Sequence, residues 1–153
     1  MTEAQLSNAM DAYGSTVYRL ALTRMQNIAD AEDVYQEVFL RLWKQAAEDW
    51  DGDRAKAWLI RTTLNRCADL HRFRLRRPVL SFAEIPDLAQ PEDESRELWE
   101  AVSRLPEKAR TAVHLYYAEG YSAEEISQLM HIPAATVRTR LHRARKQLKE
   151  LLG

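Results

Sequence analysis

The chain has 153 residues and a formal net charge of −1, which is the sum of strongly basic and strongly acidic segments. Its single cysteine, Cys67, excludes an intramolecular disulfide and a zinc site built from several cysteines. No signal peptide or membrane span is recognisable, so we expect a cytoplasmic protein without membrane insertion.

The hydrophobic periodicity predicts an all-α fold, since there is almost no β-branched alternation. We expect helices at residues 2–12, 14–26, 30–47, 54–76, 92–104, 106–119, 122–130 and 133–151. The stretch 78–91 is acidic, contains three prolines and has no helical period. It predicts a linker over residues 78–94 between two small helical domains, residues 1–77 and 95–153.

Residues 30–44 predict an amphipathic helix with an acidic face. Asp30 and Asp33 fit an N-cap and N3 pair, which the helix dipole favours. They share one side with Glu37 and Leu40, opposite an apolar stripe. An exposed leucine beside acids favours a protein-binding surface. Clustered carboxylates can also hold Mg²⁺ in a nuclease, but the sequence offers no second group of acids from another element.

The predicted helix 54–76 carries a face that combines an aromatic ring, an amide and arginines. Trp58, Thr62, Asn65, Asp69, Arg72 and Arg76 are spaced alternately by four and three residues, with Arg61 beside them and Arg77 following. Core packing of Trp58 is an equally good interpretation, because tryptophan is usually largely buried. In the functional interpretation Asn65 contacts a base edge, the arginines hold phosphates and unpaired bases stack on the ring.

The last third of the chain predicts a helix-turn-helix. Ser122 and Glu125 form a capping box for one helix, and Pro133 opens the next after a turn at 131–132. Val137, Leu141, Ala144 and Leu148 make the buried stripe of the second helix. Its other positions are polar or basic, and no acid occurs between Pro133 and Lys149. A charge of one sign on this helix favours DNA binding over a merely solvated face.

Three motifs in this order resemble the extracytoplasmic-function (ECF) sigma factors of bacterial RNA polymerase, in the sigma-70 family. Residues 30–43 (DAEDVYQEVFLRLW) are similar to region 2.2 of the family. Residues 57–69 (AWLIRTTLNRCAD), with the arginines to Arg77, are similar to regions 2.3 and 2.4. Residues 105–145 are similar to region 4.

The resemblance implies a dissociable, non-enzymatic subunit that recognises promoters and promotes DNA melting, with no cofactor and no metal. It implies docking on the polymerase β′ clamp helices by Asp33, Gln36, Glu37 and Leu40. It implies contacts with the −10 promoter element by Trp58, Arg61, Thr62, Asn65, Asp69, Arg72, Arg76 and Arg77, with the loop 48–53. It implies contacts with the −35 element by Thr136, Arg138, Thr139, Arg140, His142, Arg143 and Lys146.

Within the −35 set, Arg138, Thr139, His142 and Arg143 are expected nearest the bases, whereas Arg140 and Arg145 are expected to hold phosphate or structure. The polymerase β flap and an anti-sigma factor are further implied partners. The alternative is a LuxR-type regulator, because residues 120–146 also resemble that helix-turn-helix. A ligand sensor, however, has no need of the two faces in residues 30–77.

Overall fold

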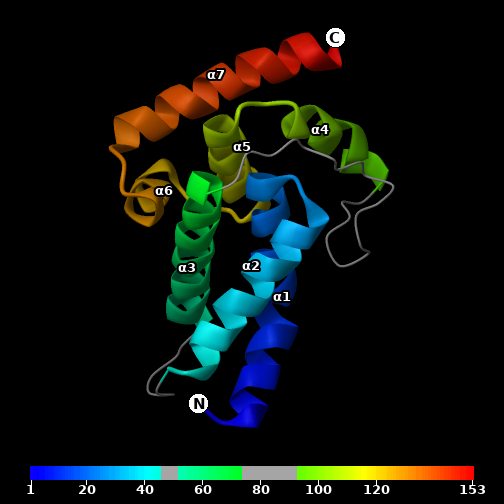
Figure 1. Ribbon diagram of the computed structural model, residues 1–153. Coiled ribbons are helices and arrows are strands. Elements are labelled where there is room, and N and C mark those ends of the chain that lie inside the picture. The colour runs from blue at the N-terminus through cyan, green and yellow to red at the C-terminus, as the bar shows by residue number, and fades with distance from the viewer. Residues whose placement is uncertain (46–51, 74–92) are drawn as a thin grey trace. The chain divides into compact units, whose positions relative to one another are not determined.

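The computed structural model describes residues 1–45, 52–73 and 93–153. Every regular element in these ranges is a helix, which confirms the all-α prediction (Figure 1). The chain divides into two compact units, Met1–Leu80 and Ser81–Gly153. None of the described helices is both long enough and apolar enough to cross a bilayer.

The first unit is a bundle of three helices, α1 (Glu3–Met25), α2 (Ile28–Trp43) and α3 (Gly52–Phe73), each in contact with the other two. Aliphatic side chains from all three are fully buried between them: Val17, Leu20, Met25, Val34, Val38, Leu42, Leu59 and Ile60. Burying one such side chain stabilises a fold by roughly 1.5–3 kcal/mol. The bundle therefore holds the outer faces of α2 and α3 in fixed orientations.

Helix α1 runs unbroken through Gly14, so the prediction of two helices at 2–12 and 14–26 is wrong. A glycine inside a helix costs roughly 0.5–1 kcal/mol relative to alanine. Here it makes room for a neighbour, because a Cβ at Gly14 would lie 3.1 Å from the hydroxyl oxygen of Tyr35. The glycine thus serves close packing between α1 and α2 and does not interrupt the helix.

Helix α2 begins earlier than predicted and is capped by a different residue. The side chain of Asn27 accepts a hydrogen bond of 3.0 Å from the backbone N–H of Asp30. Asp30 is therefore the N3 residue and not the N-cap, and it is buried, with 6% of its surface exposed. Its assignment to the exposed acidic face is wrong. The helix ends at Trp43.

Helix α3 begins at Gly52, two residues before the predicted start. The hydroxyl of Tyr13 donates a hydrogen bond of 3.0 Å to the carbonyl oxygen of Gly52, which ties α1 to this start. The predicted continuation of the helix over residues 74–76 lies outside the described residues, as do residues 46–47 of the predicted helix 30–47.

The second unit contains α4 (Asp93–Ser103), α5 (Glu107–Val113), a π-helical turn η1 (His114–Ala118), α6 (Ala123–Met130) and α7 (Ala134–Leu152). The long α7 packs against α4, α5 and α6. The predicted helix 106–119 is thus α5 continued by η1. Gly120, with φ +75°, ends this segment in a conformation that glycine adopts without strain. Beside it, the side chains of Tyr116 and Tyr117 are exposed.

Candidate nucleic-acid interface

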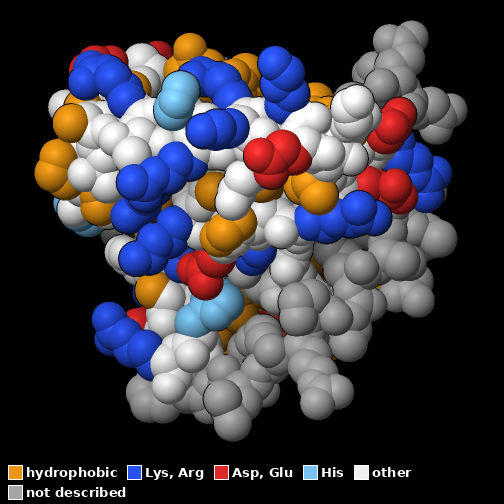
Figure 2. Space-filling view, turned by 90° about the horizontal axis from the view of Figure 1, so that it is seen from above, with side chains coloured by type: hydrophobic (Ala, Val, Ile, Leu, Met, Phe, Trp, Pro, Cys, Tyr) orange, Lys and Arg blue, Asp and Glu red, His pale blue; other side chains and the backbone are white. Residues whose placement is uncertain are grey.

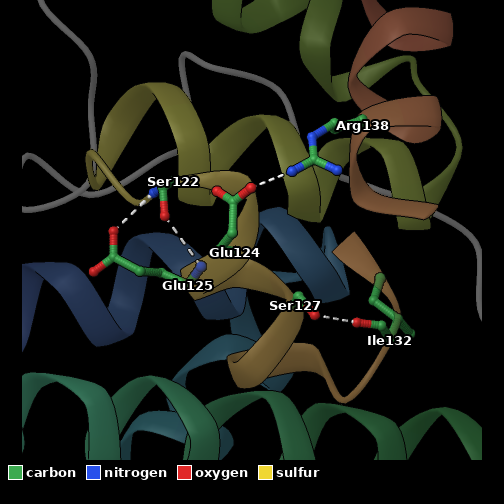
Figure 3. A network of polar contacts seen from close by, with 6 residues as sticks. All are labelled: Ser122, Glu124, Glu125, Ser127, Ile132 and Arg138. Atoms are coloured by element: carbon green, nitrogen blue, oxygen red, sulfur yellow. Dashed lines mark hydrogen bonds and ion pairs between the residues drawn. The ribbon is translucent and has the colours of Figure 1, made fainter. Parts of the chain in front are cut away.

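The helix-turn-helix is built from α6 and α7, and its first helix begins with the predicted capping box (Figure 3). The hydroxyl of Ser122 accepts a hydrogen bond of 3.1 Å from the backbone N–H of Glu125. The Glu125 carboxylate accepts one of 2.9 Å from the backbone N–H of Ser122. These two hydrogen bonds, the backbone one first, lower the pKa of Glu125 below its ordinary value. The cap confirms the predicted start of this helix.

The turn between the two helices is fixed by backbone geometry and by one side chain. His131 ends α6 with φ 55°, in the left-handed region. The backbone N–H of Ile132 donates a bond of 3.2 Å to the carbonyl oxygen of Ser127. The Ser127 hydroxyl donates in turn to the Ile132 carbonyl (Figure 3). Pro133 then lies immediately before α7, where its fixed φ suits the helix start.

Helix α7 buries the predicted stripe and exposes the predicted cations. Val137, Leu141, Ala144 and Leu148 are buried. The exposed polar and basic side chains on the rest of the helix include Arg138, Thr139, His142, Arg143, Arg145, Lys146 and Lys149, and Leu151 and Leu152 are exposed at its end. Thr136 and Arg140 are half-buried. In Figure 2, Lys and Arg side chains gather on the face seen from above, where α7 runs.

Two of the exposed arginines contact residues of preceding elements. Arg138 forms an ion pair with Glu124 in the first turn of α6. Arg145 donates a hydrogen bond of 2.7 Å from Nε to the hydroxyl of Tyr117 in η1. Both arginines line one cleft of about 410 Å³, together with Tyr116, Ser122, Ala123, Glu124 and Leu141. All three arginines are exposed, and these two differ from Arg143 in their contacts with Glu124 and Tyr117.

Helix α3 presents part of its predicted face. Arg61, Asn65 and Arg72 are exposed. Trp58 is half-buried, which decides neither for core packing nor for base stacking. Asp69 is also half-buried and lies 3.7 Å from the guanidinium of Arg72. Arg76 and Arg77 lie outside the described residues.

Thr62 differs from its neighbours on this face, because only 8% of its surface is exposed. It is packed with the core side of α3, where Leu59, Ile60 and Cys67 are fully buried. The prediction that Thr62 shares an open face with Asn65 is therefore wrong. Its position on the helical wheel lies at the border between the exposed and the buried face of α3.

Helix α2 presents Asp33, Gln36 and Leu40 on its exposed side. Glu37 is half-buried and accepts a hydrogen bond of 3.1 Å from Nε of Arg41, one turn later. Leu40 is 48% exposed, and Trp43, three residues on, is 40% exposed. An exposed leucine and tryptophan at this spacing lie on the same side of the helix. They make an apolar patch bordered by charge, which is typical of a protein-binding surface.

Two family models match the chain, one in each unit. The model described as sigma-70 region 2 matches residues 9–77. The model described as sigma-70, region 4 matches residues 95–148.

Whole-chain relatives agree with both models. The chain is 34% identical over 152 residues to the ECF RNA polymerase sigma factor SigE of Mycolicibacterium smegmatis, covering 92% of this chain and 59% of that one. It is 30% identical over 157 residues to the ECF RNA polymerase sigma factor SigL of Mycobacterium tuberculosis, covering 96% of this chain and 89% of that one. This chain belongs to the ECF group of the sigma-70 family.

A solved structure shares the fold of this sigma factor. It is the sigma factor RpoE of Bartonella quintana, in complex with the anti-sigma factor NepR. The TM-score is 0.73 at 21% identity, over 98% of this chain and 95% of that chain.

The sigma factor family accounts for the N-terminal unit as well as the helix-turn-helix. The LuxR-type alternative, with an unrelated N-terminal domain, is therefore not supported. The chain is a promoter-recognising transcription initiation factor. No group of three or more histidine, cysteine or carboxylate side chains placed to hold a metal occurs among the described residues.

Three features of the interface were not predicted from the sequence. They are the exposure of Trp43, the ion pair of Glu124 and the hydrogen bond of Tyr117 to Arg145. The spacing of Trp43 from Leu40 carried a signal, because residues three apart share a helix face. The other two features are contacts between residues that lie far apart in the sequence. Glu124 and Arg138 are separated by 14 positions, and Tyr117 and Arg145 by 28, so no local pattern indicates either contact.

Proposed function

We propose that this sigma factor binds core RNA polymerase through α2, binds and opens the −10 promoter element through α3 and recognises the −35 element through α7. One observation carries the proposal. The second helix of the helix-turn-helix exposes a series of cations opposite a buried apolar stripe. In this motif the second helix enters the major groove of DNA.

At the −35 element, Arg143 is proposed to contact a base, because its side chain is exposed on α7. A bidentate contact between arginine and guanine contributes about 1–3 kcal/mol of discrimination. Thr139 and His142 are exposed on the same helix and complete the proposed contacts with Arg138. Half-buried Thr136 and Arg140, with Lys146, are proposed to contact the DNA backbone.

At the −10 element, the exposed amide of Asn65 is proposed to contact a base once the duplex has opened, with half-buried Trp58 and Asp69 beside it. Arg61 and Arg72 are exposed and suited to phosphates. Arg76 and Arg77 keep the same proposed role on sequence grounds alone. Thr62 is buried, so we propose that it supports this face from below and does not contact DNA.

For core polymerase, the proposed docking surface consists of Asp33, Gln36, Glu37 and Leu40, extended by Trp43. It would meet the clamp helices of the β′ subunit, as the family resemblance implies. Its apolar centre with an acidic border matches a partner with an apolar patch among basic side chains.

Membership of the ECF group supports further proposals on organisation and partners. Residues 1–77 would bind core polymerase and the −10 element, residues 95–153 the −35 element, and residues 78–94 would link them. The polymerase β flap and an anti-sigma factor are proposed partners. The proposed place of action is the bacterial cytoplasm, where the polymerase works, and no catalytic activity of its own is proposed.

The proposed function is tested by run-off transcription with core polymerase and genomic DNA, followed by mapping of the start sites. Specific initiation that depends on this chain is the expected result. A selection from promoters with a randomised −35 element then compares Arg143→Ala with Lys146→Ala. Arg143→Ala should relax preference at one base pair, whereas Lys146→Ala should weaken binding evenly and flatten its salt dependence. An unchanged base preference in Arg143→Ala would assign base recognition to other residues of α7.

A further inference from the structure

Glu124 brings a negative charge to a helix that has no acid of its own between Ala134 and Lys149. It is the second residue of α6, and its carboxylate accepts a hydrogen bond from Nη2 of Arg138 on α7. The two residues are 14 positions apart and join the two helices of the helix-turn-helix. We propose that Glu124 is a positioning residue that orients Arg138 for base recognition and so sets the preference at one base pair of the −35 element.

Adjacent acids at the start of α6 have different partners. Glu125 turns back to Ser122 and closes the capping box. Glu124 points the other way, toward α7 and the guanidinium of Arg138 (Figure 3). Since capping is already supplied by Glu125 and Ser122, the start of the helix does not need the side chain of Glu124 for its own hydrogen bonds.

Stability does not account for the pair either. The side chain of Glu124 is 63% exposed and that of Arg138 is 58% exposed. Exposed ion pairs contribute little to folding. An acid beside a phosphate backbone also weakens DNA binding, because it repels the phosphates. The negative charge of Glu124 therefore lowers affinity for DNA of any sequence. A stronger preference for one base pair can offset this loss.

The geometry supplies that specificity. Arginine has a planar fork of five N–H donors, and Glu124 engages Nη2. The remaining donors can still form the bidentate contact that distinguishes guanine from other bases. A side chain that is already held in one orientation loses less rotamer freedom when it binds. Arg138 is held by Glu124 and lines the cleft that Leu141 and Arg145 also line.

This inference rests on the proposed role of Arg138, and the experiment tests the two separately. The full chain, assembled with core polymerase, selects from promoters with a randomised −35 element. The variants are Arg138→Ala, Glu124→Ala, Glu124→Gln and the double variant with both alanines. Glu150→Ala is the control, because it removes an exposed acid from the same helix-turn-helix unit.

Arg138→Ala should lower the preference at one base pair by roughly 5- to 150-fold. Glu124→Ala should lower the preference at that same base pair by about three-fold or more, while affinity for unrelated DNA stays equal or rises. The double variant should match Arg138→Ala, and Glu124→Gln, which keeps the acceptor oxygen, should fall between Glu124→Ala and the unchanged protein. Glu150→Ala should keep the full preference.

If Arg138→Ala keeps the full preference, the proposed base contact of Arg138 is wrong and the role of Glu124 falls with it. If Arg138→Ala relaxes the preference and Glu124→Ala does not, only the positioning role is wrong. A Glu124→Ala protein that loses preference equally at every position, with a lower unfolding temperature, would show a structural role and also overturn the inference.

Discussion

The hydroxyl oxygen of Tyr117 accepts a hydrogen bond of 2.7 Å from Nε of Arg145, which joins η1 to α7. The guanidinium carbon of Arg145 also lies 5.7 Å from the ring centroids of Tyr116 and Tyr117. The two rings are edge to face, with centroids 4.8 Å apart. Arg145 is thereby held within its own unit, and its phosphate-binding or structural role stays a prediction.

Arg145→Ala should therefore destabilise the protein by about 1 kcal/mol, through loss of one exposed hydrogen bond and two cation–π contacts. Its −35 base preference should not change. Denaturant unfolding measures the first effect and promoter selection the second. Lys149→Ala, an exposed cation of the same helix, is the control and should leave stability within about 0.5 kcal/mol. A relaxed base preference in Arg145→Ala would contradict the structural role.

Tyr18→Phe should stabilise the protein. The hydroxyl of Tyr18 is buried and has no hydrogen-bond partner among the described residues. Burial, with a smaller effect of Glu32, raises the pKa of Tyr18. Since an unpaired buried hydroxyl costs free energy, its removal should raise the free energy of unfolding by about 1 kcal/mol. The ring contact with Tyr35, at 6.1 Å between centroids, should persist.

Tyr13→Phe is the matched control, because the hydroxyl of Tyr13 donates to the carbonyl oxygen of Gly52. Its loss should lower the free energy of unfolding by about 0.5–1.5 kcal/mol. Urea denaturation of both variants decides the comparison, and a Tyr18→Phe protein that is as destabilised as Tyr13→Phe would refute the prediction.

The capping box predicts a dependence of stability on pH. The pKa of Glu125 is lower in the folded chain than its ordinary value of 4.5, so the unfolded state binds its proton more readily. The stabilisation is complete above pH 4.5 and is lost as pH falls through the lower, folded pKa. Glu125→Gln keeps an acceptor for the N–H of Ser122 but cannot titrate. Thermal unfolding below pH 4.5 should therefore lose less stability in this variant than in the unchanged protein, and equal losses would contradict the assignment.

Binding to core polymerase should depend on the exposed side of α2. Leu40→Arg combined with Glu37→Lys should weaken binding strongly, because it replaces an apolar contact and reverses a charge at the proposed interface. Both positions are outside the core, so thermal unfolding should change little. Glu97→Lys with Leu98→Arg makes the same two changes on exposed residues of α4 and is the control. Co-elution with core polymerase is the measurement, and equal binding by both double variants would exclude this surface.

Promoter opening should depend on Asn65. Because bases can stack or pair with protein groups only after they leave the duplex, Asn65→Ala should slow open-complex formation more than closed-complex binding. Fluorescence of 2-aminopurine placed in the −10 element reports opening, and gel retardation reports binding. Asn8→Ala, at an exposed position of α1, is the control. Normal opening by a folded Asn65→Ala protein would contradict the proposed role of Asn65 in melting.

The parts of this protein that the sequence by itself determined are those whose partners are near neighbours in the chain. The capping box joins Ser122 and Glu125, three residues apart, and side-chain type alone specifies it. The stripe from Val137 to Leu148 follows the helical period, which is set by backbone geometry. The order of the motifs, read with the family resemblance, was likewise enough to indicate the function.

Contacts between helices were decided only in the tertiary structure. Gly14 lies inside one continuous helix, where the ring of Tyr35 from α2 packs closely against it. Thr62 is buried although it lies at the border of the polar face of α3. Glu124 was directed to Arg138, and not to its own helix, because the turn at 131–132 brings α7 beside the start of α6. A periodic pattern states which face of a helix is apolar, but the element that meets that face, and how closely, depends on the path of the whole chain.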